Sequence, residues 1–245
     1  MPLQSAHVFA SHIGHTGKTT LCYQMSCYSA KRNPDVSVLV MDLAEEGDLT
    51  KRLLGGVNAA QKVDELFGPR AFSPLTIAGD TMTTGLTSWL WSSTSDLSEH
   101  AVKVSDHNPA IPENLFLMSS GSWPCSTEVE MSEDERKLVC ARIQESFGKS
   151  EATWKLFCDT DGDRRPSLFT KIAYGLCPYA IVPLPLNRCD LDRTENMMEL
   201  MHQLRSTGEI STQVLFIVWN NVKSHKDEPM AVSYTHLRAH ETSEY

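Results

Sequence analysis

The residues with the clearest chemical potential lie in one short stretch near the N-terminus, which reads Ser11-His12-Ile13-Gly14-His15-Thr16-Gly17-Lys18-Thr19-Thr20. An apolar segment at residues 6–10 precedes this stretch, and a helical pattern follows it. A loop between a strand and a helix gathers backbone N–H groups and a helix N-terminus around an anion. Lys18 would then reach the outer phosphates of a nucleotide, and Thr19 would ligate Mg²⁺.

This loop departs from the general phosphate-loop pattern at one position. The pattern has glycine five residues before Gly17, where His12 stands here. Gly14 and Gly17 still give the loop backbone freedom. His12 and His15 either contact phosphate or are solvated loop histidines, and both interpretations stay open. The predicted nucleotide-binding residues of the loop are Gly14, His15, Thr16, Gly17, Lys18, Thr19 and Thr20.

Two acidic residues end later apolar segments that read as strands. Asp42 follows the segment at residues 36–41, and Asp159 follows the segment at residues 153–158. The carboxyl ends of strands in an open parallel sheet line the ligand crevice, so Asp42 is expected to face the loop. Asp159 is the second candidate for the Mg²⁺ shell; its alternative role is to start a turn with Asp161-Gly162. We predict Thr19, Asp42 and Asp159 as metal-binding residues, and Lys18 and Asp42 as catalytic residues.

Strand and helix patterns alternate along most of the chain. Further strands are expected at residues 112–121, 179–184 and 214–221, and further helices at residues 128–148, 166–174 and 192–205. This alternation predicts an α/β fold of three layers, with a mostly parallel sheet flanked by helices. Residues 55–112 show weak periodicity and are expected to form an irregular or helical excursion.

Apolar residues recur at helical spacing in two of the expected helices. After the loop, Leu21, Met25 and Tyr28 recur at helical spacing. On the helix at residues 128–148, the apolar stripe consists of Leu138, Val139, Ile143 and Phe147.

Charge and cysteine content restrict the class of protein. The net charge is −9, which argues against non-specific DNA binding, because such binding needs clustered Lys and Arg. The seven cysteines are odd in number and form no C-x-x-C pair, so reduced thiols in a cytoplasmic protein are expected. The sequence has no uninterrupted apolar run of membrane-spanning length.

The ordered set of motifs resembles the ParA/MinD family of P-loop ATPases. Residues 14–20 and 38–50 look like the phosphate loop and the switch segment of that family. Residues 112–121, and residues 157–160 together with 179–185, are similar to later strands of the family. Val218-Trp219-Asn220 looks like the strand whose terminal asparagine contacts adenine. The resemblance covers roughly residues 5–222, where we expect one ATPase domain.

Several functional properties are implied by this resemblance. It implies ATP and Mg²⁺ as cofactors, a homodimer, and a partner or cargo protein whose partitioning or positioning depends on the nucleotide. Asn220 is the residue that the resemblance assigns to the base.

Departures from the family pattern bear on catalysis. Ile13 stands where the family has a lysine that crosses the dimer interface to the partner's nucleotide, and Ala44 stands where it has an aspartate that orients the attacking water. His15 and the Asp161-Gly162 pair also differ from the pattern. Losing a cation and a carboxylate each removes stabilisation of the transition state. We therefore predict ATP binding with slow or impaired hydrolysis, and Asp48 stays an open replacement for the missing aspartate.

The last residues do not continue the domain pattern. Residues 223–245 have no matching periodicity, and residues 232–242 look like translated sequencing-adapter read-through. We expect this segment to be a disordered, non-domain tail that replaces a truncated C-terminal part of the family fold.

Three functional hypotheses remain open at this point. The first is an ATP-dependent switch whose output is a conformation. The second is a P-loop enzyme of a synthetase or amidoligase type, which would need a substrate-binding set that residues 55–112 do not reveal. The third is a scaffold whose nucleotide site has decayed, as His12, Ile13, His15 and Ala44 suggest.

Overall fold

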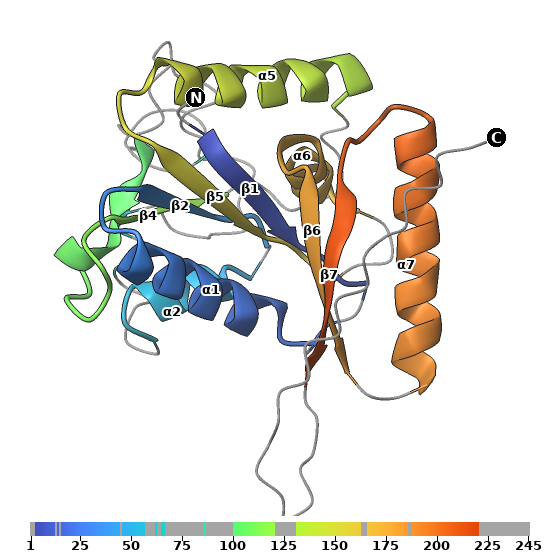
Figure 1. The fold of residues 1–245 in the computed structure, drawn as a ribbon, viewed down its shortest axis with the longest axis horizontal. Coiled ribbons are helices and arrows are strands. Elements are labelled where there is room, and N and C mark those ends of the chain that lie inside the picture. The colour runs from blue at the N-terminus through green and yellow to red at the C-terminus, as the bar shows by residue number, and fades with distance from the viewer. Residues whose placement is uncertain are drawn as a thin grey trace, which may run out of the picture.

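In the computed structural model, the described part of the chain contains one seven-stranded sheet (Figure 1). The described residues are 3–12, 14, 16–44, 46–56, 62, 65, 66, 86, 100–120, 131–162, 166–185 and 188–220, with the backbone alone at 188 and 220. The strands are β1 Leu3–Phe9, β2 Ser37–Asp42, β3 Val102–Lys103, β4 Leu115–Ser119, β5 Trp154–Asp159, β6 Tyr179–Pro185 and β7 Gln213–Asn220.

The strand order places β1 in the interior of the sheet. The order is β3-β4-β2-β5-β1-β6-β7, and all neighbours are parallel except β3 and β4. From β1 the chain first builds the β2 side of the sheet and then continues on the β6 side. The order of strands therefore reverses around β1, and such a reversal opens a ligand crevice at the carboxyl ends of the strands.

Helices cover both faces of the sheet (Figure 1). The helices of the described residues are α1 Lys18–Arg32, α2 Asp48–Leu53, α5 Glu133–Lys149, α6 Leu168–Leu176 and α7 Arg188–Ser206, with a 3₁₀ turn η3 at Val104–Asp106. One core cluster joins the sheet to α5, α6 and α7, and the other joins it to α1 and α2. Because strands with both faces covered are apolar throughout, β2 has buried residues from Val38 to Asp42. The predicted three-layer α/β fold is confirmed.

One asparagine fixes the start of β2 relative to α1. The Asn114 side-chain amide donates to the carbonyl oxygens of Ala30 at 3.0 Å, Asn33 at 2.9 Å and Val36 at 2.8 Å. The backbone N–H of Val38 in turn donates to the Asn114 carbonyl oxygen at 2.8 Å. These bonds fix the position of β2 along the sheet, and therefore the position of Asp42 at its end.

The predicted apolar residues of two helices are confirmed only in part, since Leu21, Met25, Val139, Ile143 and Phe147 pack on the core and Tyr28 and Leu138 do not. On α1 the buried face consists of Lys18, Cys22, Ser26 and Ala30, whereas Tyr28 is 65% exposed. On α5 the predicted residue Leu138 is 70% exposed, and Arg136 and Cys140 are buried beside Ile143 and Phe147. Both helices approach the sheet through small or amphipathic side chains, which a hydropathy pattern does not weight strongly.

Two boundaries and one strand also differ from the prediction. Helix α5 begins at Glu133 rather than at residue 128, because the Ser132 hydroxyl caps it by accepting from the Glu135 backbone N–H. Helix α7 begins at residue 188, four residues before the predicted start. Strand β3, an antiparallel edge strand of two residues, lies inside the stretch that was expected to be irregular.

The predicted tail at residues 223–245 lies outside the described residues. Among the residues that the structure describes, no helix is both long enough and apolar enough to cross a bilayer.

Candidate nucleotide and metal site

The predicted phosphate loop lies between β1 and α1, which confirms the predicted order of strand, loop and helix, and β1 is an interior strand of the sheet. Gly17 immediately precedes α1 with a φ of 91°, a left-handed conformation that favours glycine. Its carbonyl oxygen accepts the first helical bond from the Leu21 N–H at 2.8 Å. The Lys18 side chain is largely buried, with 7% exposed. A buried ammonium at the N-terminus of a helix favours the approach of an anion.

Asp42 ends β2 with both carboxylate oxygens in contact with backbone. Its Oδ2 accepts from the Thr50 N–H at 2.7 Å and from the Thr50 hydroxyl at 2.6 Å, and its Oδ1 lies 3.4 Å from the Ala44 N–H. Asp42 is fully buried. The start of α2 therefore holds this carboxylate in one orientation at the edge of the sheet.

Asp159 ends the adjacent strand β5 and is the register partner of Asp42. It is fully buried, and neither of its carboxylate oxygens makes a hydrogen bond of ordinary geometry to a described residue. Burial and the negative charge of Asp42 raise the pKa of Asp159 to about 7, against the opposing effects of Thr19 and Lys18. Two buried oxygens that make no bond of ordinary geometry within the described part of the chain, beside a second carboxylate, are a donor set that fits a hard divalent cation.

Backbone bonds between neighbouring strand ends keep the two carboxylates in place. The Leu43 N–H donates to the Asp159 carbonyl oxygen at 3.0 Å, and the Ser120 N–H donates to the Asp42 carbonyl oxygen at 2.9 Å. The Thr160 hydroxyl donates to the Phe9 carbonyl oxygen at 2.8 Å. The carboxyl ends of β4, β2, β5 and β1 thus form one connected edge below the phosphate loop.

A second contact joins α2 to α1. The Arg52 guanidinium donates to the Thr20 hydroxyl at 2.8 Å, across 32 positions of sequence. Thr20 lies in the first turn of α1, next to Thr19. Helix α2 is therefore tied both to Asp42 and to the helix that follows the phosphate loop.

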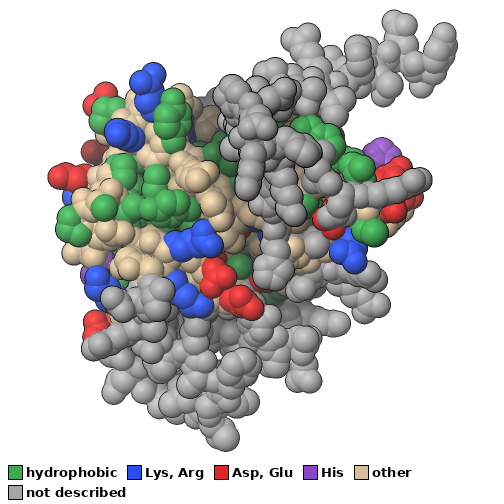
Figure 2. Space-filling view, turned by 90° about the horizontal axis from the view of Figure 1, so that it is seen from below, with side chains coloured by type: hydrophobic (Ala, Val, Ile, Leu, Met, Phe, Trp, Pro, Cys, Tyr) green, Lys and Arg blue, Asp and Glu red, His purple; other side chains and the backbone are tan. Residues whose placement is uncertain are grey.

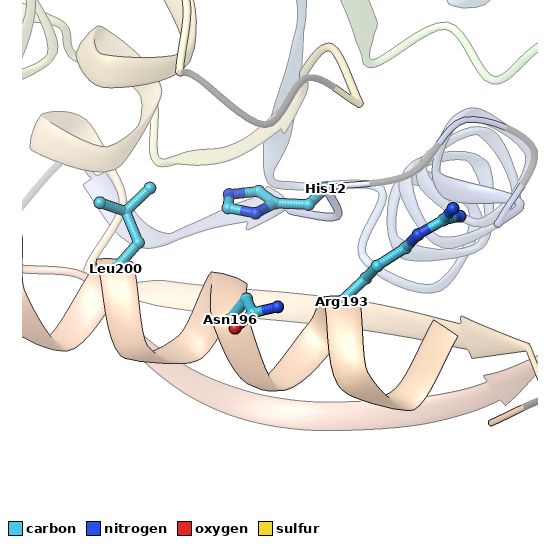
Figure 3. Close-up of a pocket in the computed structure, with 4 residues that line it drawn as sticks. All are labelled: His12, Arg193, Asn196 and Leu200. Carbon is cyan, nitrogen blue, oxygen red and sulfur yellow. The ribbon is translucent and has the colours of Figure 1, made fainter. Parts of the chain in front are cut away.

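A cavity of about 340 Å³ lies between the start of the loop and α7 (Figure 3). It is lined by His12 from the loop and by Arg193, Asn196 and Leu200 from α7. In Figure 3 the imidazole of His12 faces the helix, and Leu200 and Arg193 rise from α7 on either side of Asn196. Arg193 lies 3.6 Å from the Asp190 carboxylate one turn earlier. Three of the four lining side chains carry hydrogen-bond donors.

The structure brings most of the predicted site residues together. Lys18 and Thr19 both act on the pKa of Asp159, and Asp42 is its register partner. Gly14 lies exposed in the loop, and Thr16 is buried. Asp48, the open replacement for the missing aspartate, binds Lys51 at 3.1 Å on the exposed start of α2.

Some predicted residues lie outside the described set. These are Ile13, His15 and the side chain of Asn220. Thr50 and Arg52 were not predicted as site residues, although Thr50 ends the segment that resembles the family switch and Arg52 follows two residues later. The sequence offered one indication for Thr50: a threonine in the first turn of a helix often bonds a nearby acceptor through its hydroxyl.

Comparison with known proteins identifies similar folds among solved structures but no relative by sequence. No protein-family profile and no curated protein sequence matches the chain. The solved structure of apo McdA from Cyanothece is similar, with a TM-score of 0.63 and 15% identity over 92% of this chain and 77% of that chain. A plasmid partition protein from Borrelia burgdorferi is similar, with a TM-score of 0.61 and 14% identity over 91% of this chain and 80% of that chain.

The chain has a ParA/MinD-like fold. The same P-loop architecture occurs in cobyrinic acid a,c-diamide synthase from Mycobacterium smegmatis, which was determined with ADP and magnesium. That enzyme has a TM-score of 0.58 and 14% identity over 87% of this chain and 73% of that chain. At such identities the likeness is one of fold, so the activity of this ParA/MinD-like chain has to follow from its own residues.

Proposed function

We propose that the protein is an ATP-binding switch of the partition or positioning type, with slow or impaired Mg²⁺-dependent hydrolysis. The observation that carries this proposal is the juxtaposition of buried Lys18, Thr19 and the register pair Asp42 and Asp159 at one edge of the sheet. A buried cation supports phosphate binding, and the two buried carboxylates Asp42 and Asp159 on adjacent strand ends support metal binding.

Each side chain has a distinct task in this proposal. Lys18 binds the outer phosphates, and the backbone of residues 14–20 holds the others. The Thr19 hydroxyl, Asp42 and Asp159 hold the metal, and Asn220 contacts the base. Bound Mg²⁺ supplies positive charge to the phosphate oxygens during transfer. Asp42 remains oriented by Thr50, so it is prepared for its role before the ligand arrives.

Slow hydrolysis follows from two side chains of this sequence. Ile13 carries no charge, and Ala44 has no group that can orient water. The Ala44 N–H is directed at Asp42, which places this residue beside the carboxylates, where such a group would act. The output of the protein is then a conformation that changes dimerisation or the affinity for a partner, and not a product.

The decisive experiment is isothermal titration of ATP–Mg²⁺ into the protein and into Lys18→Ala, with phosphate release measured on the same samples. We expect micromolar binding by the protein, about 100-fold weaker binding by the variant, and little phosphate release. Arg205→Ala on α7 is the matched control, since it removes an exposed cation far from the loop. Absence of binding by the unmodified protein would contradict the proposal and favour the decayed scaffold.

The switch output has its own test. Light scattering after gel filtration should show a larger particle with ATP–Mg²⁺ than with ADP–Mg²⁺ if ATP promotes a homodimer. Direct DNA binding is not part of the proposal, because the net charge is −9. On the described part of the face in Figure 2, Lys and Arg side chains are spread among acidic and apolar ones and do not form one patch.

A second candidate function is favoured by the cavity beside the loop. A P-loop enzyme of the synthetase or amidoligase type needs a site for an acidic substrate next to the nucleotide. His12, Arg193 and Asn196 would offer donors to a carboxylate at such a position. The discriminating measurement is phosphate release from ATP in the presence of pooled carboxylic acids: strong stimulation that is lost in Arg193→Ala would favour the enzyme over the switch.

A further inference from the structure

We propose that Arg52 is a phosphate-binding residue that contacts the inner phosphates shared by ADP and ATP. This inference rests on the proposed nucleotide-binding function and extends it to a residue of α2. It assigns a ligand to a guanidinium that lies at the start of α1 and has no acidic partner within the described part of the chain.

The position of Arg52 is fixed from two directions. Two residues before it, Thr50 anchors α2 to Asp42 through bonds of 2.7 and 2.6 Å. The guanidinium itself donates to the Thr20 hydroxyl at 2.8 Å. A long exposed side chain is held by this contact against the first turn of α1.

Positive groups gather at this position, although Asp42 and Asp159 lie at the neighbouring strand ends. The N-terminus of a helix carries partial positive charge, and Lys18 adds a buried ammonium in the same turn. Arg52 adds a third positive group near them through its contact with Thr20. A phosphate bound there would be attracted to all three, because Arg binds phosphate oxygens through several N–H groups at once.

The neighbouring cations do not offer the same arrangement. Lys51 is bonded to the Asp48 carboxylate at 3.1 Å, and Arg193 lies 3.6 Å from Asp190 on the other face of the sheet. Lys18 is the only lysine or arginine in residues 11–20. Arg52 is therefore the cation that is best placed to add charge next to Thr20.

The identity of the phosphate follows from the order of residues along the loop. Lys18 and Thr19 serve the outer phosphates and the metal, while the loop backbone holds the inner ones. Thr20 is one residue farther along α1, and Arg52 binds its hydroxyl. Contact there acts on phosphates that ADP and ATP have in common, so Arg52 should not distinguish the two nucleotides.

The test is isothermal titration of ADP–Mg²⁺ and of ATP–Mg²⁺ into the full chain and its variants. Arg52→Ala should weaken both nucleotides by the same factor, about tenfold. Arg52→Gln keeps a hydrogen-bond donor for Thr20 but removes the charge, and it should weaken both to a similar extent. Lys51→Ala is the matched control on the same helix and should change neither affinity by more than about twofold.

Four outcomes would overturn the inference. If Arg52→Gln bound both nucleotides like the unmodified protein, the contact with Thr20 would be purely structural. If Arg52→Ala weakened ATP alone, the assignment to inner phosphates would be wrong. If Arg52→Ala bound both nucleotides normally while Lys18→Ala did not bind, the proposed function would stand without a role for Arg52. If the unmodified protein bound neither nucleotide, both the proposed function and this inference would be wrong.

Discussion

Asp42 and Asp159 are register partners on adjacent parallel strands, so two fully buried carboxylates end side by side at the carboxyl edge of the sheet. They differ in their contacts, because Asp42 accepts from Thr50 while Asp159 has no donor of ordinary geometry among the described residues. This asymmetry leaves one carboxylate oriented and the other available to a cation.

The first prediction concerns the pH dependence of stability without metal. The pKa of Asp159 is raised from 3.8 to about 7 by burial and by the charge of Asp42. The carboxyl group of Asp159 loses its proton near pH 4 in the unfolded chain and near pH 7 in the folded protein. The contribution of Asp159 to the free energy of unfolding is therefore fully present below pH 4. It falls as the pH rises towards 7, by at most about 4 kcal/mol. Urea unfolding at several pH values, with metal chelated, measures this slope.

Two variants separate Asp159 from the other acids of the protein. Asp159→Asn should remove the slope between pH 4 and pH 7, since the amide does not titrate. Asp42→Asn should reduce it, because the repulsive charge disappears while the burial of Asp159 remains. An unchanged slope in Asp159→Asn would show that another group is responsible.

The second prediction concerns Thr50. Its buried hydroxyl and N–H are both bonded to Asp42, so Thr50→Val leaves a buried carboxylate with one donor fewer. We expect a loss of about 1–3 kcal/mol in the free energy of unfolding. Thr50→Ser keeps the hydroxyl and should lose less. Equal destabilisation by valine and serine would mean that the methyl group, and not the hydroxyl, matters at this position.

The third prediction concerns the packing of α5 on α6. A methyl group at Gly175 would lie 2.7 Å from the Sγ of Cys140. Gly175→Ala should therefore cost about 1–3 kcal/mol through overpacking, even though alanine is the better helix former. In a Cys140→Ala background the clash is absent, and the same change should stabilise the protein by up to about 1 kcal/mol. A double-mutant cycle by thermal unfolding gives the sign of the coupling energy between the two positions. Additive effects of the two changes would contradict the proposed contact.

The sequence was sufficient for the order of the strands and helices other than α2 and β3, and for the acids that end β2 and β5. These features depend on local patterns: a glycine-rich loop after an apolar run, and an acid after each of two others. It was not sufficient for the faces of α1 and α5. The buried residues Cys22, Ser26 and Ala30 are small, and their contribution depends on how closely the helix approaches the sheet. That distance is a property of the tertiary structure.

The contacts between α2 and the site could not be predicted from the sequence alone either. Thr50 contacts Asp42 across 8 positions, and Arg52 contacts Thr20 across 32. Neither residue type is diagnostic at its position. Only the packing of a six-residue helix against α1 turns Arg52 into a neighbour of the phosphate loop.

The last prediction tests why hydrolysis should be slow. Ala44 is half-buried just beyond β2, and its N–H lies 3.4 Å from Asp42 Oδ1. A carboxylate at this position could orient water towards the outer phosphate, which is the task that alanine cannot perform. We therefore expect Ala44→Asp to raise the rate of phosphate release from ATP at least about tenfold, with little change in ATP affinity.

The matched control is Ala44→Asn, which has nearly the same shape as aspartate without its charge. It should leave the rate of phosphate release close to that of the unmodified protein. An equal increase in both variants would indicate that loop conformation limits the reaction. No increase in Ala44→Asp, with ATP binding intact, would show that a different deficiency limits hydrolysis, and the uncharged Ile13 would then be the next position to change, to lysine. The rate and the affinity must be measured on the same samples, so that a change in the rate of hydrolysis is separated from a change in ATP binding.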